Sequence, residues 1–338
     1  MPTESKTFAL KSLRPEEREM VLKATFGSTE FGILLTDLDH VSIACNSRFG
    51  AIFGVEIEGV VSSTVDQVRE MVRKRIPDYE AWEQNLGEVY SNPAHSQNDV
   101  LSLQNPMQVI ERSTRPVLDE DGNPMGRLWT FLDVTARHYE RQIAELQQEI
   151  SLFFHPDPKE VYSHIVSRLS AFYETTCVLS IQEGTYMHFQ AISSPIPEVE
   201  QMTGNDIASS YCQFCQETLE PTLIQNALET PRFAKILPAS LGITRYAGVP
   251  LRAPDGQFIG TLCILDHRSD ELLGEVDMHL ISLMGMRVSA ELERETRIKN
   301  LERDLDSATQ RMIQGEKLAI TGTLAASVAH DIRNIVSS

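Results

Sequence analysis

The sequence predicts an α+β protein of two domains, each with an antiparallel sheet and flanking helices, connected and followed by helices with narrow apolar stripes. The length of 338 residues suffices for two or three domains. Two stretches, at 29–135 and 156–290, mix helical composition with short runs rich in β-branched and aromatic residues, which are typical of strands. The segments after them, 136–155 and 291–316, space their apolar residues three and four apart, as one face of a helix does.

The first stretch divides at its turn residues. Before it, a short amphipathic helix is expected in the N-terminal segment 1–28, from Pro15 onward, because proline suits the first helical position and acidic residues follow it. Two short strands around an Asp/His turn are expected in 31–46, followed by helices interrupted at Pro77. Three further strands complete the domain, at 98–104, 107–118 and 124–135.

The second stretch repeats this alternation in a different order. Helices are expected at 160–174 and at 206–220, and a Pro-Asp-Gly turn joins two strands into a hairpin over 245–266. A long helix follows from about Leu273. Short strands are expected at 178–184, 186–192 and 222–226.

Both connecting helices carry an apolar stripe that is too narrow to form a core by itself. The stripe of 136–155 consists of Ile143, Leu146, Ile150 and Phe153. The stripe of 291–316 has heptad spacing and consists of Ile298, Leu301, Leu305, Ala308 and Met312. Val288 and Leu292 are out of phase with it, which predicts a stutter. Together the stripes predict a coiled-coil, parallel homodimer that carries signals along its axis.

The composition excludes several function classes. The chain has 30 basic and 48 acidic residues, a formal net charge of −18. Binding to nucleic acid or to an anionic membrane depends on Lys and Arg, so we expect neither partner. No run approaches the roughly 20 apolar residues that span a bilayer, and the start lacks the apolar core of a signal peptide. Five cysteines, an odd number in a large chain, fit reduced thiols, and we expect a cytoplasmic protein.

The segment from Gly315 to Ser338, GEKLAITGTLAASVAHDIRNIVSS, contains the strongest chemical signal. It has the composition of a helix rich in small residues, in which His330 precedes Asp331. A neighbouring carboxylate can orient a histidine and keep it nucleophilic, although a histidine on a coiled coil can also be a solvated surface residue. The whole phrase resembles the H-box of sensor histidine kinases.

That resemblance implies a role for each residue of the box. His330 takes the phospho-accepting place and Asp331 that of the acidic neighbour that assists proton removal. Arg333 and Asn334 continue the box, and Asn334 stands where the family can hold the attacking water during dephosphorylation. Ile335 departs from the family, which usually has proline there, so the helix is expected to run straight.

The sequence ends soon after the box, before the second hairpin helix and the ATP-binding domain of such kinases. It contains no G-x-x-x-x-G-K-[ST] or G-x-G-x-x-G pattern for binding phosphates. The resemblance therefore implies a chain truncated just after the H-box of the dimerisation and phosphoacceptor domain, which begins here at 317–338. ATP and Mg are expected only with the missing catalytic domain, and the chain is expected to be inactive alone.

Residues 29–140 resemble a PAS domain. The resemblance rests on GILLTDLDHVSIACNSRFGAIFG and GRLWTFLDVTAR, and on family positions occupied by Asn46, Phe49, Phe53 and Gly54. Asp133-Val-Thr is similar to the motif that couples the sheet of this family to its output helix, and Asp133 is expected to cap that helix. The N-C-R-F-L-Q phrase of flavin-adduct members is absent. Trp82 and Trp129 are expected in the core or in a pocket wall.

Residues 156–295 resemble a GAF domain. The matching phrases are YCQFCQETLEPTLIQNALETPRF and ITRYAGVPLRAPDGQFIGTLCILD. No cysteine precedes a histidine, as bilin binding in this family requires. Asn226 and Phe233 echo the cyclic-nucleotide pattern of the family, but its Lys and acidic pair are missing. A small-molecule ligand in either domain remains open.

Cys212 and Cys215 form a C-x-x-C on an expected helix, where both face one side, and Cys263 lies on a strand that could approach them. Three interpretations are open: small buried hydrophobic residues, a redox-sensing dithiol, or a metal or iron–sulfur site. A zinc site would need a fourth ligand, for which His188 is a weak candidate, so no metal is predicted. The candidate redox pair is Cys212 and Cys215, with Cys263 nearby.

These patterns combine into one leading hypothesis. The chain resembles the sensory part of a cytosolic two-component sensor histidine kinase, a homodimer that autophosphorylates on His330 and passes phosphate to an Asp of a response regulator. A non-catalytic PAS/GAF adaptor that senses a ligand or redox state is the alternative. A phosphotransfer intermediate that accepts phosphate in trans is a third.

Overall fold

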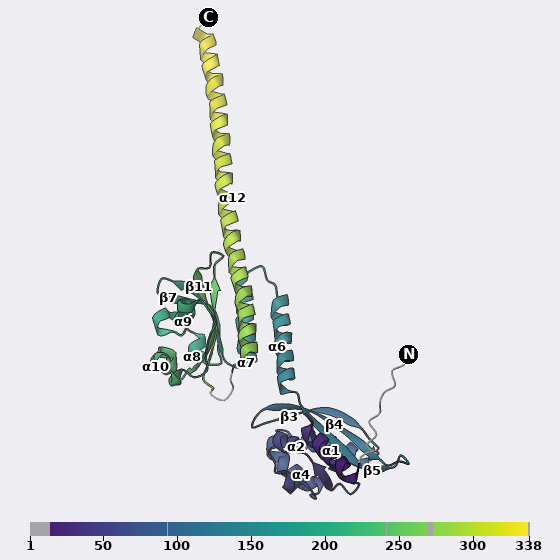
Figure 1. Cartoon of the computed structure of the whole chain (residues 1–338). Helices are drawn as coiled ribbons and strands as arrows, with labels where there is room; N and C mark the ends of the chain where they lie inside the picture. The colour runs from purple at the N-terminus through teal and green to yellow at the C-terminus, as the bar shows by residue number, and fades with distance from the viewer. Residues whose placement is uncertain (1–13, 93, 241, 269–272, 337–338) are drawn as a thin grey trace. The chain divides into compact units, whose positions relative to one another are not determined.

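The computed structural model describes residues 14–336, apart from 93, 241 and 269–272; the side chains of 85, 88, 319 and 323–336 are likewise outside the description. The chain divides into two compact units (Figure 1), one ending at Arg141 and the other beginning at Gln142.

The first unit contains a five-stranded antiparallel sheet of order β2-β1-β5-β4-β3. Its strands are β1 (Gly32–Thr36), β2 (Ser42–Cys45), β3 (Gln97–Leu103), β4 (Gln108–Leu118) and β5 (Pro124–Asp133). The last strand in sequence therefore lies in the centre of the sheet, where it pairs with β1 and β4. The helix after it starts from this central position.

Short helical elements connect β2 to β3, and all of them except η2 bury apolar residues in the core against this sheet. They are α2 (Ser47–Phe53), α3 (Ile57–Val60), α4 (Val65–Val72), η2 (Arg73–Arg75) and α5 (Tyr79–Ser91). Asn46 begins α2, because its side chain accepts the Phe49 amide at 3.0 Å, and Gly54 ends it with a φ of 68°. Phe49, Phe53 and Phe131 form the centre of the core, with ring centroids 4.9–5.4 Å apart.

The first helix, α1 (Pro15–Ser28), forms where the sequence predicted it, but it is not the amphipathic helix that was expected. None of its residues is buried, and Met20 and Leu22 are exposed. Proline and the acidic first turn were sufficient to place the helix start, whereas its apolar residues do not gather on one face.

The second unit contains a six-stranded antiparallel sheet of order β8-β7-β6-β11-β10-β9. Its strands are β6 (Thr176–Glu183), β7 (Tyr186–Ser193), β8 (Gly204–Asp206), β9 (Thr222–Ile224), β10 (Arg245–Arg252) and β11 (Phe258–Asp266). Figure 1 shows α7 (Pro158–Tyr173) and α12 (Glu275–Val336) on one side of the sheet and α9 (Cys212–Thr218) on the other. Further short elements are α8 (Pro197–Glu200), η3 (Ile207–Ser209), η4 (Ala227–Glu229), α10 (Pro231–Ala234) and α11 (Leu237–Ser240).

The helix expected at 206–220 is in fact two elements, η3 and α9. Ser210 separates them with an extended backbone, φ −124° and ψ 152°. Its hydroxyl accepts the Cys212 amide at 3.0 Å, and the Asp206 carboxylate accepts the Ala208 amide at 2.9 Å. Such local side-chain bonds compete with the helical hydrogen bonds and shorten the helix.

The apolar stripe of the linker helix α6 (Thr135–Leu152) is not the dimer seam that the sequence predicted. Ile143, Leu146 and Ile150 are buried in the same core as apolar residues of α7 and α12, and Phe153 packs against it. The stripe therefore packs inside the second unit and is not available as the dimer seam that the sequence predicted. A narrow apolar stripe has the same spacing whether it faces another copy or its own domain.

The long helix α12 changes its environment along its length. Leu280, Met284 and Val288 are buried in the sheet-facing core. Farther along, Ile298, Leu301, Leu305 and Met312 are 42–75% exposed. Val288 and Leu292, which are out of phase with the heptad stripe, thus lie where the buried face of the helix gives way to the exposed stripe. No helix in the described ranges is both long enough and apolar enough to cross a membrane.

Candidate functional site

Three thiols meet in the second unit, on the sheet face that α9 covers. Cys212 and Cys215 lie one turn apart on α9, and Cys263 lies on β11. All three are free, buried and part of one apolar cluster. The sequence placed the pair on a helix and Cys263 on a neighbouring strand, and the structure brings all three together.

Hydroxyl groups of two strands contact these sulfur atoms. Thr261 Oγ1 donates to Cys212 Sγ at 3.2 Å, and Tyr246 OH lies 3.8 Å from the same sulfur. Tyr246 OH is also 3.3 Å from Cys215 Sγ. Sequence reasoning missed both hydroxyl residues. The signal for Thr261 was present, because it stands two positions before Cys263 and therefore faces the same side of β11.

The contacts give the thiols different acidities. A hydrogen bond from the Cys263 thiol, with further bonds from Ser210 and Thr261, lowers the pKa of Cys212 to about 6, although burial opposes this. Donating that bond, together with burial, raises the pKa of Cys263 well above its ordinary value. Burial raises the pKa of Cys215 to about 11. Cys212 is thus the thiol of this cluster that can carry a negative charge near neutral pH.

His188 does not join the cluster. It lies on β7 with a side chain that is 44% exposed, and its Nε2 is 3.5 Å from Glu183 Oε2. Within the described residues, no group of three or more His, Cys, Asp or Glu side chains is arranged to hold a metal ion.

The first unit contains a cavity of about 40 Å³, which is room for one or two water molecules. It lies among Leu34, Val65, Val68, Arg69, Trp82, Leu86, Tyr90, Arg112 and Trp129. The two tryptophans are therefore pocket wall, as the sequence predicted, and Trp129 is 4% exposed. Arg112 is buried and forms an ion pair with Asp99 on the neighbouring strand β3.

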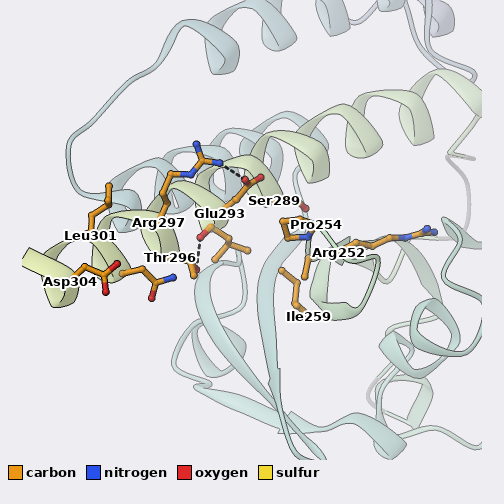
Figure 2. Close-up of a pocket in the computed structure, with 12 residues that line it drawn as sticks. Arg252, Pro254, Ile259, Ser289, Glu293, Thr296, Arg297, Leu301 and Asp304 are labelled. Atoms are coloured by element: carbon orange, nitrogen blue, oxygen red, sulfur yellow. Dashed lines mark hydrogen bonds and ion pairs between the residues drawn. The ribbon is translucent and has the colours of Figure 1, made fainter. Parts of the chain in front are cut away.

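A groove of about 430 Å³ follows α12 where it leaves the sheet (Figure 2). Pro254 and Ile259 border it from the β10–β11 hairpin, and Leu292 and Leu301 border it from α12. Figure 2 shows Arg297 and Glu293 side by side on the helix, where they form an ion pair of 2.8 Å. The groove includes Leu301, the second residue of the exposed stripe.

The residues of the H-box phrase fall on the last turns of α12. His330, Asp331 and Asn334 lie in the same continuous helix as the buried residues near its start, and the helix continues through Ile335. Their side chains are outside the described part of the chain. At the end of β5, the Asp133 carboxylate accepts the Thr135 amide at 3.1 Å and the Thr135 hydroxyl at 2.6 Å, as expected for a residue that begins α6.

Two family models match separate parts of the chain. The model described as PAS fold matches residues 26–139, and the model described as GAF domain matches residues 157–292. The first unit therefore has a PAS fold and the second a GAF fold, as the sequence predicted, and the long helix after the GAF domain fits a signalling helix. No curated protein matches the chain.

Solved structures of both kinds of domain are similar to parts of the chain. The GAF domain of a phosphoenolpyruvate-protein phosphotransferase from Coxiella burnetii is 19% identical, with a TM-score of 0.39, over 47% of this chain and 94% of that one. A PAS domain from Colwellia psychrerythraea is 19% identical, with a TM-score of 0.28, over 35% and 98%. The PAS domain of Bordetella pertussis BvgS is 17% identical, with a TM-score of 0.30, over 39% and 98%.

Proposed function

We propose that this chain is the sensory part of a cytosolic two-component sensor histidine kinase, whose PAS and GAF domains control phosphorylation of His330. The presence of both sensory domains supports a role in signal sensing. One observation carries the finer proposal: the helix that is buried in the GAF core at Val288 continues as a single element to the H-box phrase around His330.

That continuity offers a mechanical route for the signal. A helix rises about 1.5 Å per residue, so His330 lies roughly 63 Å along the axis from Val288. A change in GAF packing at Leu280, Met284 or Val288 turns or tilts the start of the helix. Because the helix has no break before Val336, a rotation at one end reaches the other. A stimulus thereby shifts the box between two arrangements.

The proposed chemistry uses three side chains of the box. The neutral imidazole of His330 attacks the γ-phosphorus of ATP, which a catalytic domain outside this chain would supply with Mg²⁺. A P–N bond forms, the bond to ADP breaks, and Asp331 takes the imidazole proton. The phosphoryl group then passes to an Asp of a response regulator. Asn334 holds the attacking water when the phosphate is removed instead.

The exposed stripe of α12 supports a dimeric arrangement. Ile298, Leu301, Leu305 and Met312 follow heptad spacing and have 42–75% of their surface accessible in a single chain. A second copy in parallel would cover this stripe and place two H-boxes side by side. The homodimer therefore rests on α12 alone, since the α6 stripe is already buried.

The test supplies an active histidine-kinase catalytic domain in trans, with ATP labelled in its γ-phosphate. We expect acid-labile, base-stable phosphate on the chain, abolished by His330→Gln. The matched control is His279→Gln, an exposed histidine near the start of the same helix, which should leave labelling unchanged. Phosphate that persists in His330→Gln, with the protein folded, would overturn the proposal in favour of a non-catalytic sensory adaptor.

A further inference from the structure

Within the buried thiol cluster of the GAF core, Cys263 on β11 donates a hydrogen bond to Cys212 on α9. We propose that these two thiols are an oxidant-sensing site, which hydrogen peroxide converts into a disulfide between α9 and β11. The site stands on its own contacts and does not depend on phosphorylation of His330.

Cys212 on α9 lies over strand β11. Thr261 and Cys263 are two residues apart on that strand, so both face α9. The Cys212 sulfur receives a hydrogen bond from Thr261 at 3.2 Å and one from the Cys263 thiol. Cys215 lies one helical turn farther along and is 3.3 Å from the Tyr246 hydroxyl instead. Two of the groups that donate to the Cys212 sulfur, Thr261 and Cys263, therefore lie on β11.

Several hydrogen-bond donors surround the Cys212 sulfur. Ser180 Oγ lies 2.9 Å from Thr261 Oγ1, so its proton can pair with Thr261 while Thr261 donates to Cys212. Tyr246 OH adds a weaker contact at 3.8 Å. A neutral thiol is a poor acceptor, whereas a thiolate in an apolar core is stabilised by every such donor. The surroundings of Cys212 therefore stabilise a negatively charged sulfur.

The burial of these cysteines determines which oxidants can reach their sulfur atoms. Cys212 is 7% exposed, Cys263 is 2% exposed and Cys215 is fully buried. A bulky disulfide could not reach any of these sulfurs without local unfolding. Hydrogen peroxide is close to water in size and uncharged, so it can enter through small fluctuations of the core. The site therefore suits peroxide and not exchange with a large disulfide.

The chemistry takes two balanced steps. The Cys212 thiolate attacks one oxygen of hydrogen peroxide; an S–O bond forms, the O–O bond breaks and hydroxide leaves, so the sulfur becomes a sulfenic acid. The Cys263 sulfur then attacks the Cys212 sulfur; an S–S bond forms and the S–O bond breaks. The Cys263 proton leaves with the hydroxyl group as water. Peroxide is reduced by two electrons and the two thiols are oxidised by two.

The disulfide would act on the helix at the opposite face of the sheet. Leu262 and Ile264, the neighbours of Cys263, belong to the core that contains α12 residues. Drawing Cys263 toward α9 shifts the strand between them and changes how it packs under Met284 and Val288. This last step, from strand to output, is the part that rests on the proposed function.

The experiment treats the whole reduced chain with hydrogen peroxide, blocks the remaining thiols and maps linked peptides by mass spectrometry. We expect a Cys212–Cys263 link that a dithiol reverses. Cys263→Ser should accumulate a sulfenic acid on Cys212 that dimedone traps when the oxidised chain is unfolded, and Cys212→Ser should abolish both products. Cys215→Ser, one turn away on the same helix, is the matched control and should still form the link.

Two further measurements test the acidity of Cys212, and the first of them uses the unmodified protein. In the unmodified protein, the rate at which hydrogen peroxide oxidises Cys212 should be half-maximal near pH 6, whereas an ordinary thiol titrates near pH 8.5. Thr261→Val should slow its reaction with peroxide about tenfold by removing one donor to the charged sulfur. A link between Cys212 and Cys215, or no oxidation of Cys212 in the folded wild-type chain, would overturn the proposal. Phosphotransfer plays no part in either readout.

Discussion

The hydroxyl of Tyr173 donates to the buried carboxylate of Asp277 at 3.0 Å. This contact joins the last residue of α7 to the first turn of α12 within the GAF fold. The other oxygen of Asp277 accepts the Gly274 amide at 2.6 Å, so one carboxylate both begins the long helix and attaches it to its neighbour. Near the other end of α7, Tyr162 donates to Glu295 at 3.3 Å.

Removing the Tyr173 hydroxyl should destabilise the GAF unit. Tyr173→Phe leaves the buried Asp277 oxygen without this donor, and we expect the free energy of unfolding to fall by about 1–3 kcal/mol. Urea denaturation of the whole chain measures it. Tyr162→Phe is the control, because its longer bond goes to a partly exposed Glu295, and its effect should be smaller. Equal losses in the two variants would contradict this account.

Dimerisation should depend on α12 and not on α6. Leu301→Asp together with Leu305→Asp places charges on the exposed stripe, and sedimentation velocity should then show folded monomers. Arg303→Asp, an exposed position of the same helix segment, should leave the dimer intact. Leu146→Asp should unfold the GAF unit, since that side chain is 4% exposed in its core. A dimer that survives the double substitution would remove α12 as the interface.

In the ion pair of Arg112 and Asp99, replacing Asp99 should destabilise the PAS unit more than replacing Arg112. Arg112 is 3% exposed, and Asp99 Oδ1 accepts its Nε at 2.7 Å. Asp99→Ala leaves a buried guanidinium without its carboxylate and should lower the stability of the PAS unit by about 3 kcal/mol. Arg112→Met removes the charge that needs compensation and leaves the less buried partner, so its cost should be smaller. Chemical denaturation compares them, and the reverse order would refute the argument.

Acid should destabilise the junction between β5 and α6, because the Asp133 carboxylate becomes protonated there. Burial raises the pKa of this carboxyl, but hydrogen bonds from the Thr135 hydroxyl and amide and from Gln108 outweigh it, so the pKa lies below its ordinary value. A lowered folded pKa means that the stabilisation is complete above the unfolded value of about 3.9 and is lost as pH falls through the folded pKa. At pH 7, the free energy of unfolding of Asp133→Asn should therefore be about 1 kcal/mol lower than that of the wild type. The stabilities of the two proteins should converge once the pH is below the folded pKa of Asp133, and a difference that grows in acid would show the opposite linkage.

The sequence alone determined the elements and their grouping. Proline, glycine and Asp/Asn turns separate runs whose periodicity distinguishes strand from helix, so the hairpin over 245–266 and the helix break near Pro77 could be predicted from local patterns. The C-x-x-C pair was equally visible as two residues on one helical face. These features depend on neighbours in the chain, and a sequence displays such neighbours directly.

Only the tertiary structure decided which surfaces meet. The stripes at 143–153 and 298–312 look alike in sequence, yet the first packs in the GAF core and the second is exposed. Cys212 accepts a hydrogen bond from Thr261 and lies in one cluster with Cys263, because α9 packs against β11. Spacing along a chain reports which residues share a face. What that face contacts depends on the three-dimensional packing of elements that lie far apart in sequence.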